Sequence, residues 1–358
     1  MDRILFLNNL ASKKVRFNLG AGSPPIHLYP KLSLNELISV FSKETGNELL
    51  HYHQTEGIIS DLAIETIKVN ENTLIKKDNV IITNGVQEAI FLALTVFKEK
   101  KIACIDPYYP GFVDAARILN IDVFLIEERN LLSDLQKLEK GDLLYISSDF
   151  SNPSGKRLSI AERNEIAKIA EDKGFFIFDD ATYREFFLDE KYPSLFSINP
   201  NNVIHALSFS KLLAPGLRTA FVLLPKNLQK NFLQAKANVS LNNSGITQAI
   251  TGGWLLQNNF QLSSHLNLLK TRLSENRDVL VKNNILYEGG FFTSFNSDKG
   301  NFSFDSSNLL LEKFDIATCP MSLFSDKPLG YLRLCVANIE SKELIEILEI
   351  LFNFDFNK

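Results

Sequence analysis

The chain has few cysteines, a single tryptophan and no excess of charge of either sign. Its three cysteines form no CxxC pair and each lies among apolar residues, which favours buried free thiols over disulfides or a zinc site. Free thiols are typical of a reducing compartment, so we predict a cytoplasmic protein. Lysine and arginine total 38 against 42 aspartates and glutamates, a formal charge of -4. We therefore expect neither nucleic acid nor a membrane as a partner, because both are attracted by a basic surface.

Long apolar runs are missing too. No stretch reaches the roughly 18 apolar residues of a membrane span, and the apolar patch near the start of the chain is too short for a signal peptide. The five histidines form no HExxH motif. The pair Asp179-Asp180 has no third ligand at suitable spacing, so we expect no metal site. The remaining composition, 45% hydrophobic and 22% charged, is that of a globular protein with a large core.

Short apolar runs alternate with helical patterns over the first two thirds of the chain. The apolar runs are Val80–Ile82, Ile102–Ile105, Val123–Ile126, Leu143–Ile146, Phe175–Phe178, Val203–Leu207 and Phe221–Leu224. The helical patterns among them are Ser60–Val69, Val86–Phe97, Gly111–Leu119 and Ile160–Asp172, and Leu32–Leu50 also has apolar residues at helical spacing. Nearly continuous apolar strands between helices are typical of a parallel sheet covered on both faces. We predict the α/β class, with a three-layer α/β/α large domain around a mainly parallel seven-stranded sheet.

A second, smaller domain is expected after this pattern ends. A long amphipathic stretch from about Leu262 to Val281 ends the alternation of strands and helices. The remainder of the chain ends in a helical pattern, Ser341–Phe352. We predict that residues 45–258 form the large domain, that 259–358 form a small α+β domain, and that 1–44 belong with the small domain. The cleft between the two domains is the expected ligand site.

The stretch from Ser208 to Arg218, SFSKLLAPGLR, carries the strongest chemical signal. It follows an apolar strand, and its proline and glycine prevent a simple helical continuation. Lys211 therefore lies at a junction between a strand and a loop, among small hydroxyl groups and with an arginine seven residues on. This grouping suits a phosphate next to an amine that forms a Schiff base. A lone SxSK would more simply be an exposed basic turn, but the PGLR that follows favours the first interpretation.

Polar residues follow the other predicted strands as well. Gly85 in TNGVQ permits close approach of the backbone, and the helix that begins after it would attract a phosphate; a generic turn is the alternative. The strand Phe175–Phe178 ends in two carboxylates. Arg333 lies among leucine, cysteine and valine, where burial is costly without an anion. Its planar guanidinium can donate two parallel hydrogen bonds to a carboxylate, either of a ligand or of a protein side chain.

These segments, taken together, resemble those of the fold type I, class I/II aminotransferases, which use pyridoxal 5'-phosphate (PLP). The resemblance extends from Gly22 to Arg333 and includes NPSG, where the family has NPTG, and the tyrosine of HYHQTEG. It implies a catalytic Lys211 bound to PLP as a Schiff base, with Asp180 and Tyr183 as further catalytic residues. The resemblance implies that the PLP phosphate is held by Gly85, Val86, Gln87, Ser208, Ser210 and Arg218. It also implies that the ring and its oxygen contact Tyr109, Asn152, Asp180 and Tyr183, that the substrate contacts Gly22, Asn152 and Arg333, and that Tyr52 reaches the phosphate of a partner subunit.

The resemblance implies a function as well. We expect an aminotransferase that moves an amino group between an amino acid and a 2-oxo acid by a ping-pong mechanism, as a homodimer with shared active sites. A lyase or decarboxylase acting on an amino acid is the alternative, because fold, cofactor and lysine would be the same. A third possibility is the effector domain of a MocR-type transcription regulator, which we do not favour because only about twenty residues precede LGAGSPP. No second arginine can be assigned to the pocket, so a preference for dicarboxylates is not predicted.

Overall fold

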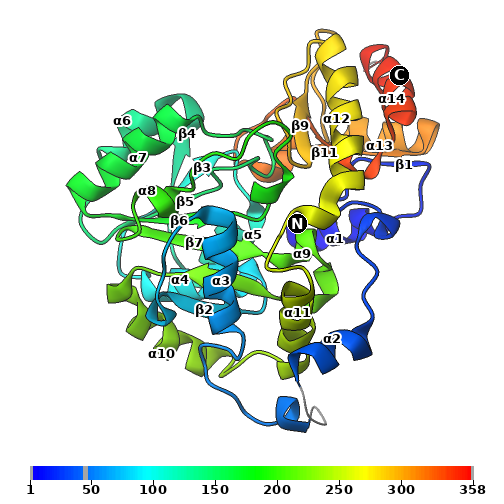
Figure 1. Ribbon diagram of the computed structural model, residues 1–358. Coiled ribbons are helices and arrows are strands. Elements are labelled where there is room, and N and C mark those ends of the chain that lie inside the picture. Colours follow the sequence, from blue (N-terminus) through cyan, green and yellow to red (C-terminus); the bar gives the residue numbers. More distant parts are fainter. Residues whose placement is uncertain (1–2, 43–46, 356–358) are drawn as a thin grey trace.

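A seven-stranded sheet forms the centre of the computed structural model, which describes residues 3–42 and 47–355 (Figure 1). The strands are β2 (Val80–Thr83), β3 (Ile102–Asp106), β4 (Val123–Glu127), β5 (Leu143–Ile146), β6 (Phe176–Asp180), β7 (Val203–Ser208) and β8 (Ala220–Leu223). Their order is β2-β8-β7-β6-β5-β3-β4, and only β8 runs antiparallel to its neighbours. The predicted α/β class and the mainly parallel seven-stranded sheet are therefore confirmed.

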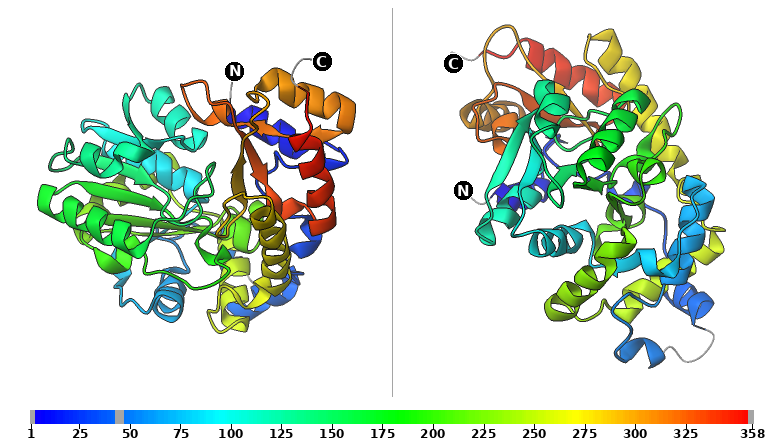
Figure 2. Two further views of the ribbon diagram at one scale, coloured as in Figure 1. Left: turned by 90° about the horizontal axis from the view of Figure 1, so that it is seen from above. Right: turned by 90° about the vertical axis from the view of Figure 1, so that its left-hand side faces the viewer.

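Helices cover both faces of this sheet (Figure 2). The helices of the larger part are α3 (Ser60–Glu71), α4 (Val86–Val96), α5 (Pro110–Ile118), α6 (Leu131–Leu135), α7 (Ile160–Lys173), α8 (Leu195–Ile198), α9 (Phe209–Leu212), α10 (Gln229–Val239) and α11 (Gly245–Gln257). Alternate strand residues belong to different cores: Ile81 packs in the core that contains Phe112 of α5 and Phe232 of α10, and Ile82 in the core that contains Ile67 of α3 and Ile166 of α7. Burial on both faces explains why the strands are apolar without alternation.

The smaller part follows α11 along the chain. It contains α12 (Asn267–Lys282), α13 (Phe304–Phe314) and α14 (Ser341–Phe352) around an antiparallel sheet of β9 (Phe292–Phe295), β11 (Cys319–Pro320) and β12 (Leu332–Cys335), in the order β11-β12-β9. The N-terminal segment contacts both parts. Its β1 (Phe17–Asn18) pairs with β10 (Ile316–Ala317), whereas a Cβ on Gly253 of α11 would lie 2.0 Å from the carbonyl oxygen of Leu37 in α2 (Leu34–Phe41). The residue limits of the domains stay a prediction.

The helical pattern of Leu32–Leu50 is realised only in part. The helix α2 ends at Phe41, residues 43–46 lie outside the described part of the chain, and a short 3-10 helix covers Asn47–Leu50. Several helices were not predicted, namely α1 (Arg3–Ala11), α6, α8, α9, α10, α11 and α13. No helix within residues 3–42 and 47–355 is long and apolar enough to cross a membrane.

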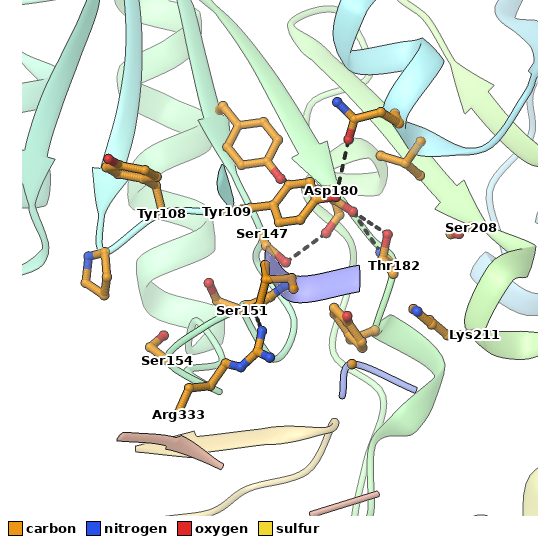
Figure 3. Close-up of a pocket in the computed structure, with 18 of the residues that line it drawn as sticks. Tyr108, Tyr109, Ser147, Ser151, Ser154, Asp180, Thr182, Ser208, Lys211 and Arg333 are labelled. Carbon is orange, nitrogen blue, oxygen red and sulfur yellow. Dashed lines mark hydrogen bonds between the residues drawn. The ribbon is translucent and has the colours of Figure 1, made fainter. Parts of the chain in front are cut away.

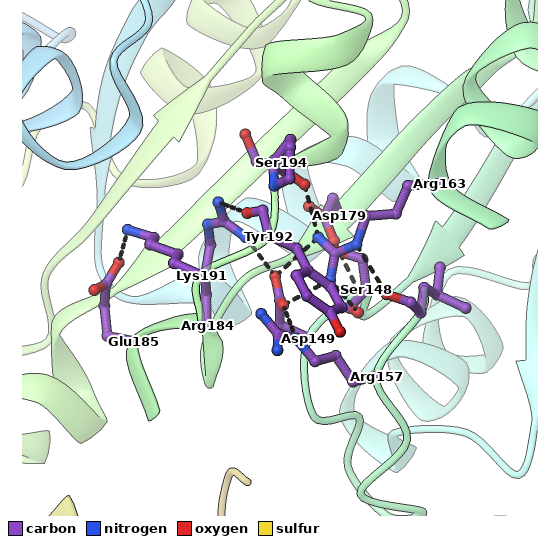
Figure 4. A network of polar contacts seen from close by, with 12 residues as sticks. Ser148, Asp149, Arg157, Arg163, Asp179, Arg184, Glu185, Lys191, Tyr192 and Ser194 are labelled. Atoms are coloured by element: carbon purple, nitrogen blue, oxygen red, sulfur yellow. Dashed lines mark hydrogen bonds and ion pairs between the residues drawn. The ribbon is translucent and has the colours of Figure 1, made fainter. Parts of the chain in front are cut away.

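A buried cluster of charged residues lies next to two segments that carry predicted site residues (Figure 4). Asp149 accepts hydrogen bonds from Arg163 at 2.6 Å, Arg184 at 2.7 Å and Arg157 at 3.2 Å. Arg184 also binds Glu71 of α3 at 2.6 Å. Burial opposes the ionisation of Asp149, but Arg184 and Arg163 outweigh it and hold its pKa well below the ordinary value. Because Asp149 precedes Asn152 and Arg184 follows Tyr183, the cluster fixes both segments against α3 and α7.

The Asp149 cluster generates a prediction about stability. Replacing Asp149 by asparagine leaves three buried arginines without their common carboxylate, and we expect the free energy of unfolding to fall by about 3–5 kcal/mol. Urea denaturation measures the change. The control is Asp189→Asn, which removes an ion pair with Arg277 in which the Asp189 side chain is 70% exposed; its effect should stay below about 1 kcal/mol. Equal effects of the two substitutions would contradict the structural role of the cluster.

Candidate active site

A cavity of about 350 Å³ lies at the carboxyl ends of β3, β5, β6 and β7, between the sheet and β12 (Figure 3). It brings together most of the residues that the sequence singled out. Those that line it are Gly22, Val86, Gln87, Tyr109, Asn152, Asp180, Tyr183, Ser208, Ser210, Lys211, Arg218 and Arg333. Gly85 caps α4 directly before Val86. Tyr52 does not line the cavity: it lies on the surface and is 87% exposed.

One end of the cavity is a group of hydrogen-bond donors around Arg218. Its guanidinium donates to Ser210 Oγ at 3.1 Å and to the carbonyl oxygen of Asn84 at 3.2 Å. Gly85 has a φ of 75°, and a Cβ there would lie 2.6 Å from Arg218 Nη2, so only glycine lets the arginine approach the start of α4. Within the described residues no carboxylate forms an ion pair with Arg218. Free backbone amides at the start of α4 and an uncompensated guanidinium suit a phosphate.

The carboxylate of Asp180 lies on the floor of the cavity. Its Oδ2 accepts a hydrogen bond from the Tyr145 hydroxyl at 2.7 Å, and its Oδ1 accepts one from the Thr182 hydroxyl at 2.6 Å. Burial raises the pKa of Asp180, which these two donors oppose. The neighbouring Asp179 is fully buried elsewhere and contacts His205 Nδ1 at 3.1 Å. Of the two carboxylates, Asp180 is therefore the one that a ligand in the cavity can reach.

Arg333 lies on the side of the cavity formed by β12. Its guanidinium donates to Asn152 Oδ1 at 2.9 Å and to the carbonyl oxygen of Gly20 at 2.6 Å. The rings of Phe292 and Phe324 flank the guanidinium, with distances of 4.5 and 4.7 Å from Arg333 Cζ to the ring centroids. Its Nε is buried without a hydrogen-bond partner among the described residues. In the part of the chain that the structure describes, no carboxylate pairs with it. The alternative interpretation, in which Arg333 forms a structural salt bridge to a protein carboxylate, is therefore not supported by the described residues.

Two tyrosines complete the wall of the cavity. The hydroxyl of Tyr109 donates to Gln87 Oε1 at 3.2 Å, and burial together with the charge of Asp180 raises its pKa to about 12. Tyr183 packs edge-on against Phe291 and Phe292, with 5.2 Å between ring centroids in both cases. Burial raises the pKa of Tyr183 far above its usual range. Both phenols therefore stay protonated at neutral pH and can donate hydrogen bonds.

Lys211 lies on α9, the short helix that directly follows β7. Burial lowers its pKa to about 8, and the positive charges of Arg218 and Arg333 act in the same direction. Within residues 3–42 and 47–355 it has no ion pair. An amine of this kind is partly neutral near pH 8 and can attack an aldehyde. One cavity thus contains the amine of Lys211, the carboxylate of Asp180, a set of hydrogen-bond donors around Arg218 that suits a phosphate, and Arg333. These groups fit PLP together with an amino acid.

The lowered pKa of Lys211 can be measured without a cofactor. A lysine reacts with acylating reagents only as the neutral amine, so the labelling rate of Lys211 in cofactor-free protein should reach half its maximum near pH 8. The ordinary value is about 10.4. Mass spectrometry of the labelled peptide follows the rate, and a lysine in a short peptide serves as the control. A midpoint as high as that of the peptide would contradict the electrostatics of the cavity.

Among proteins of known sequence, this chain is 27% identical over 290 residues to the (S)-3,5-dihydroxyphenylglycine transaminase of Amycolatopsis orientalis, covering 72% of this chain and 66% of that protein. It is 29% identical over 247 residues to the 2-aminoadipate transaminase of Thermus thermophilus, covering 65% and 61%. A stretch of 195 residues is 30% identical to the uncharacterized HTH-type transcriptional regulator YdeF of Bacillus subtilis, covering 52% and 42%. The matches thus span less than two thirds of these relatives.

The fold also matches solved structures. The α-aminoadipate aminotransferase of Thermus thermophilus, solved with N-(5'-phosphopyridoxyl)-L-leucine, has a TM-score of 0.83 at 23% identity, covering 97% of this chain and 92% of the other. At this identity the likeness concerns the fold alone. The sequence model of the family "Aminotransferase class I and II" matches residues 17–351, which is nearly the whole chain. The chain therefore belongs to the class I and II aminotransferases, a PLP-dependent family.

Proposed function

We propose that this protein is a PLP-dependent aminotransferase, which moves an amino group between an amino acid and a 2-oxo acid in a ping-pong cycle. The observation that carries the proposal is the convergence of Lys211, Asp180 and Arg333 on one cavity. Family membership supports it, because the resemblance implies a lysine that binds PLP, an aspartate at its ring and an arginine for the substrate at these three positions. Neither Lys211 nor Arg333 has a carboxylate partner among the described residues, so both are available to ligands.

The residues around Arg218 would hold the cofactor phosphate. Gly85, Val86 and Gln87 offer the start of α4, and Ser208, Ser210 and Arg218 offer side-chain donors. Asp180 would pair with the pyridine nitrogen and Tyr109 would contact the ring, while Asn152 and Tyr183 would donate to the phenolic oxygen. When bound, PLP supplies an aldehyde that captures amines and a ring that accepts electrons from the substrate.

Arg333 would bind the α-carboxylate of the substrate. Its Nη1 donates to Asn152 Oδ1 at 2.9 Å, so the amide that orients the arginine would also hold the cofactor oxygen. Gly22 lines the cavity on the same side. Lys211, with a pKa of about 8, would act as general base on the proton of the substrate α-carbon and as general acid toward the C4′ carbon of the cofactor. Because Arg333 retains the carboxylate, these residues favour chemistry at the α-hydrogen over decarboxylation.

We further propose that the enzyme is a homodimer in the cytoplasm. Tyr52 is 87% exposed on the segment between α2 and α3, and in the proposed dimer it would contact the phosphate of the partner subunit. The three cysteines are buried and free, which suits a reducing compartment.

A second candidate function is that of an effector domain, because part of the chain resembles the regulator YdeF. A regulator needs only to bind its ligand, whereas an aminotransferase must turn over. Steady transfer of amino groups from an amino acid to a 2-oxo acid decides between the two. We expect parallel lines in double-reciprocal plots at several 2-oxo acid concentrations, as a ping-pong cycle gives.

The Lys211→Ala variant tests the central residue of this proposal. We expect turnover to fall by at least about 10²–10⁴-fold, the usual contribution of a general acid or base, and the visible absorption of lysine-bound PLP to disappear. Noncovalent PLP should still bind, because the phosphate site is unchanged. The matched control is Lys270→Ala, since burial also lowers the pKa of Lys270 to about 8 but Lys270 does not line the cavity. A variant of Lys211 that keeps the absorption band would refute the assignment.

Tyr145 is a positioning residue for Asp180 that the sequence did not reveal. The Tyr145→Phe variant keeps the ring, which stacks on Phe112 with 4.1 Å between the ring centroids. It removes the hydroxyl that donates to Asp180. The hydrogen bond from Tyr145 lowers the pKa of Asp180, so the loss of the hydroxyl should raise that pKa further above its ordinary value. We therefore expect the acid limb of the kcat profile to move to higher pH. An unchanged acid limb would show that Tyr145 has only a packing role.

A further inference from the structure

The cavity extends beyond the residues assigned to cofactor and carboxylate. Its phosphate end lies near β2 and β7, at one side of the sheet, whereas Glu128 and Leu131 follow β4, the last strand at the other side. Arg333 and Asn152 lie between these two ends. A substrate held by its carboxylate at Arg333 can therefore direct its side chain toward α6 and α1. We call this far end the side-chain compartment.

One face of α1 forms a wall of the side-chain compartment. Ile4, Leu7, Asn8 and Ala11 line the cavity, and their spacing of three and four residues places them on the same side of the helix. Apart from Asn8, this face is apolar. Two further apolar side chains, Leu131 and Leu158, also line the cavity.

The position of α1 is fixed on its other side. Leu10 is buried in a core with Ala317 and Cys319, and the ring of Phe6 packs edge-on against Phe304. At the start of the helix, Arg3 binds Asp326 at 2.7 Å. Contacts with the smaller part of the molecule therefore hold α1 so that its apolar face is presented to the cavity.

The side-chain compartment offers no uncompensated cation in the described residues. Of the four basic residues that line the cavity, Lys211, Arg218 and Arg333 have been assigned to the amine, phosphate and carboxylate. The fourth, Lys156, pairs with Glu128 at 3.0 Å and with Glu162 at 3.5 Å. A second substrate carboxylate would lose its hydration there without gaining a partner, and that loss is costly.

We infer that the substrate is an amino acid with a neutral, apolar side chain of about the size of leucine, methionine or phenylalanine, and that α1 selects it. This inference rests on the proposed function, because it takes the α-carboxylate to be at Arg333. Apolar side chains gain free energy by leaving water for the α1 face. Aspartate, glutamate and 2-aminoadipate are disfavoured by the lack of a free cation.

Single-turnover measurements with the PLP-loaded enzyme test the inference. One amino acid at a time is mixed with the enzyme, and the loss of the absorption of lysine-bound PLP gives a second-order rate constant. We expect the rate constant for methionine to exceed that for glutamate, which has a side chain of similar length, by at least about 100-fold. Rate constants for glutamate or 2-aminoadipate that equal or exceed that for methionine would overturn the inference but leave the proposed function intact. No absorbance change with any amino acid would instead overturn both.

The Leu7→Ala variant tests the role of α1. Removing three carbon atoms of the leucine side chain from the wall should lower the rate constants for leucine and methionine by about tenfold or more. The rate constant for alanine should change by less than about twofold, because its methyl group does not reach α1. The control is Asn9→Ala, since Asn9 lies in a groove on the other side of the helix, and it should change none of them. An equal loss for alanine and methionine in Leu7→Ala would contradict a side-chain-selective wall.

Discussion

The structure depends on an amine held among positive charges at the end of a central strand. Lys211 lies in a cavity with Arg218 and Arg333 and without a carboxylate partner among the described residues, and its surroundings lower its pKa to about 8. Three cations that line one cavity with little compensation repel one another. A phosphate at Arg218 and a carboxylate at Arg333 would supply the missing negative charge. The same electrostatic arrangement thus keeps the amine reactive and favours an anionic cofactor and a zwitterionic substrate.

The rest of the molecule holds these cations in position. Arg333 reaches the cavity from β12 of the smaller part, and Lys211 reaches it from the end of β7. Between them, the segment with Asn152 and the segment with Tyr183 are fixed by the buried cluster around Asp149. Tyr145 and Thr182 hold the Asp180 carboxylate. The buried polar groups of the large part therefore serve to orient a few side chains at the carboxyl edge of the sheet.

Much of the fold could be predicted from the sequence, because strands that are buried on both faces are apolar without alternation and their ends carry the polar residues. The lysine, Asp180 and Arg333 stand out for the same reason: each interrupts or ends an apolar run. Other features depend on tertiary contacts. From the sequence, Tyr145 is one more residue of an apolar strand, and only the structure shows that its hydroxyl donates to Asp180. Asp149 is a loop residue in the sequence, and only the structure shows that three arginines surround it.

The helix α1 shows the same limit. Its sequence has no strong amphipathic pattern because both of its apolar faces are used, one against the smaller part and one toward the cavity. The helix α11 carries Gly252 and Gly253, which local propensity disfavours, yet close packing against α2 requires at least the second of them.

The most direct test of the central claim is to fix the cofactor chemically and find where it is attached. The PLP-loaded protein is reduced with borohydride, digested, and mapped by mass spectrometry. The structure predicts that the phosphopyridoxyl group is found on the peptide that contains Lys211 and on no other. Attachment to a different lysine, or no attachment at all, would contradict the account.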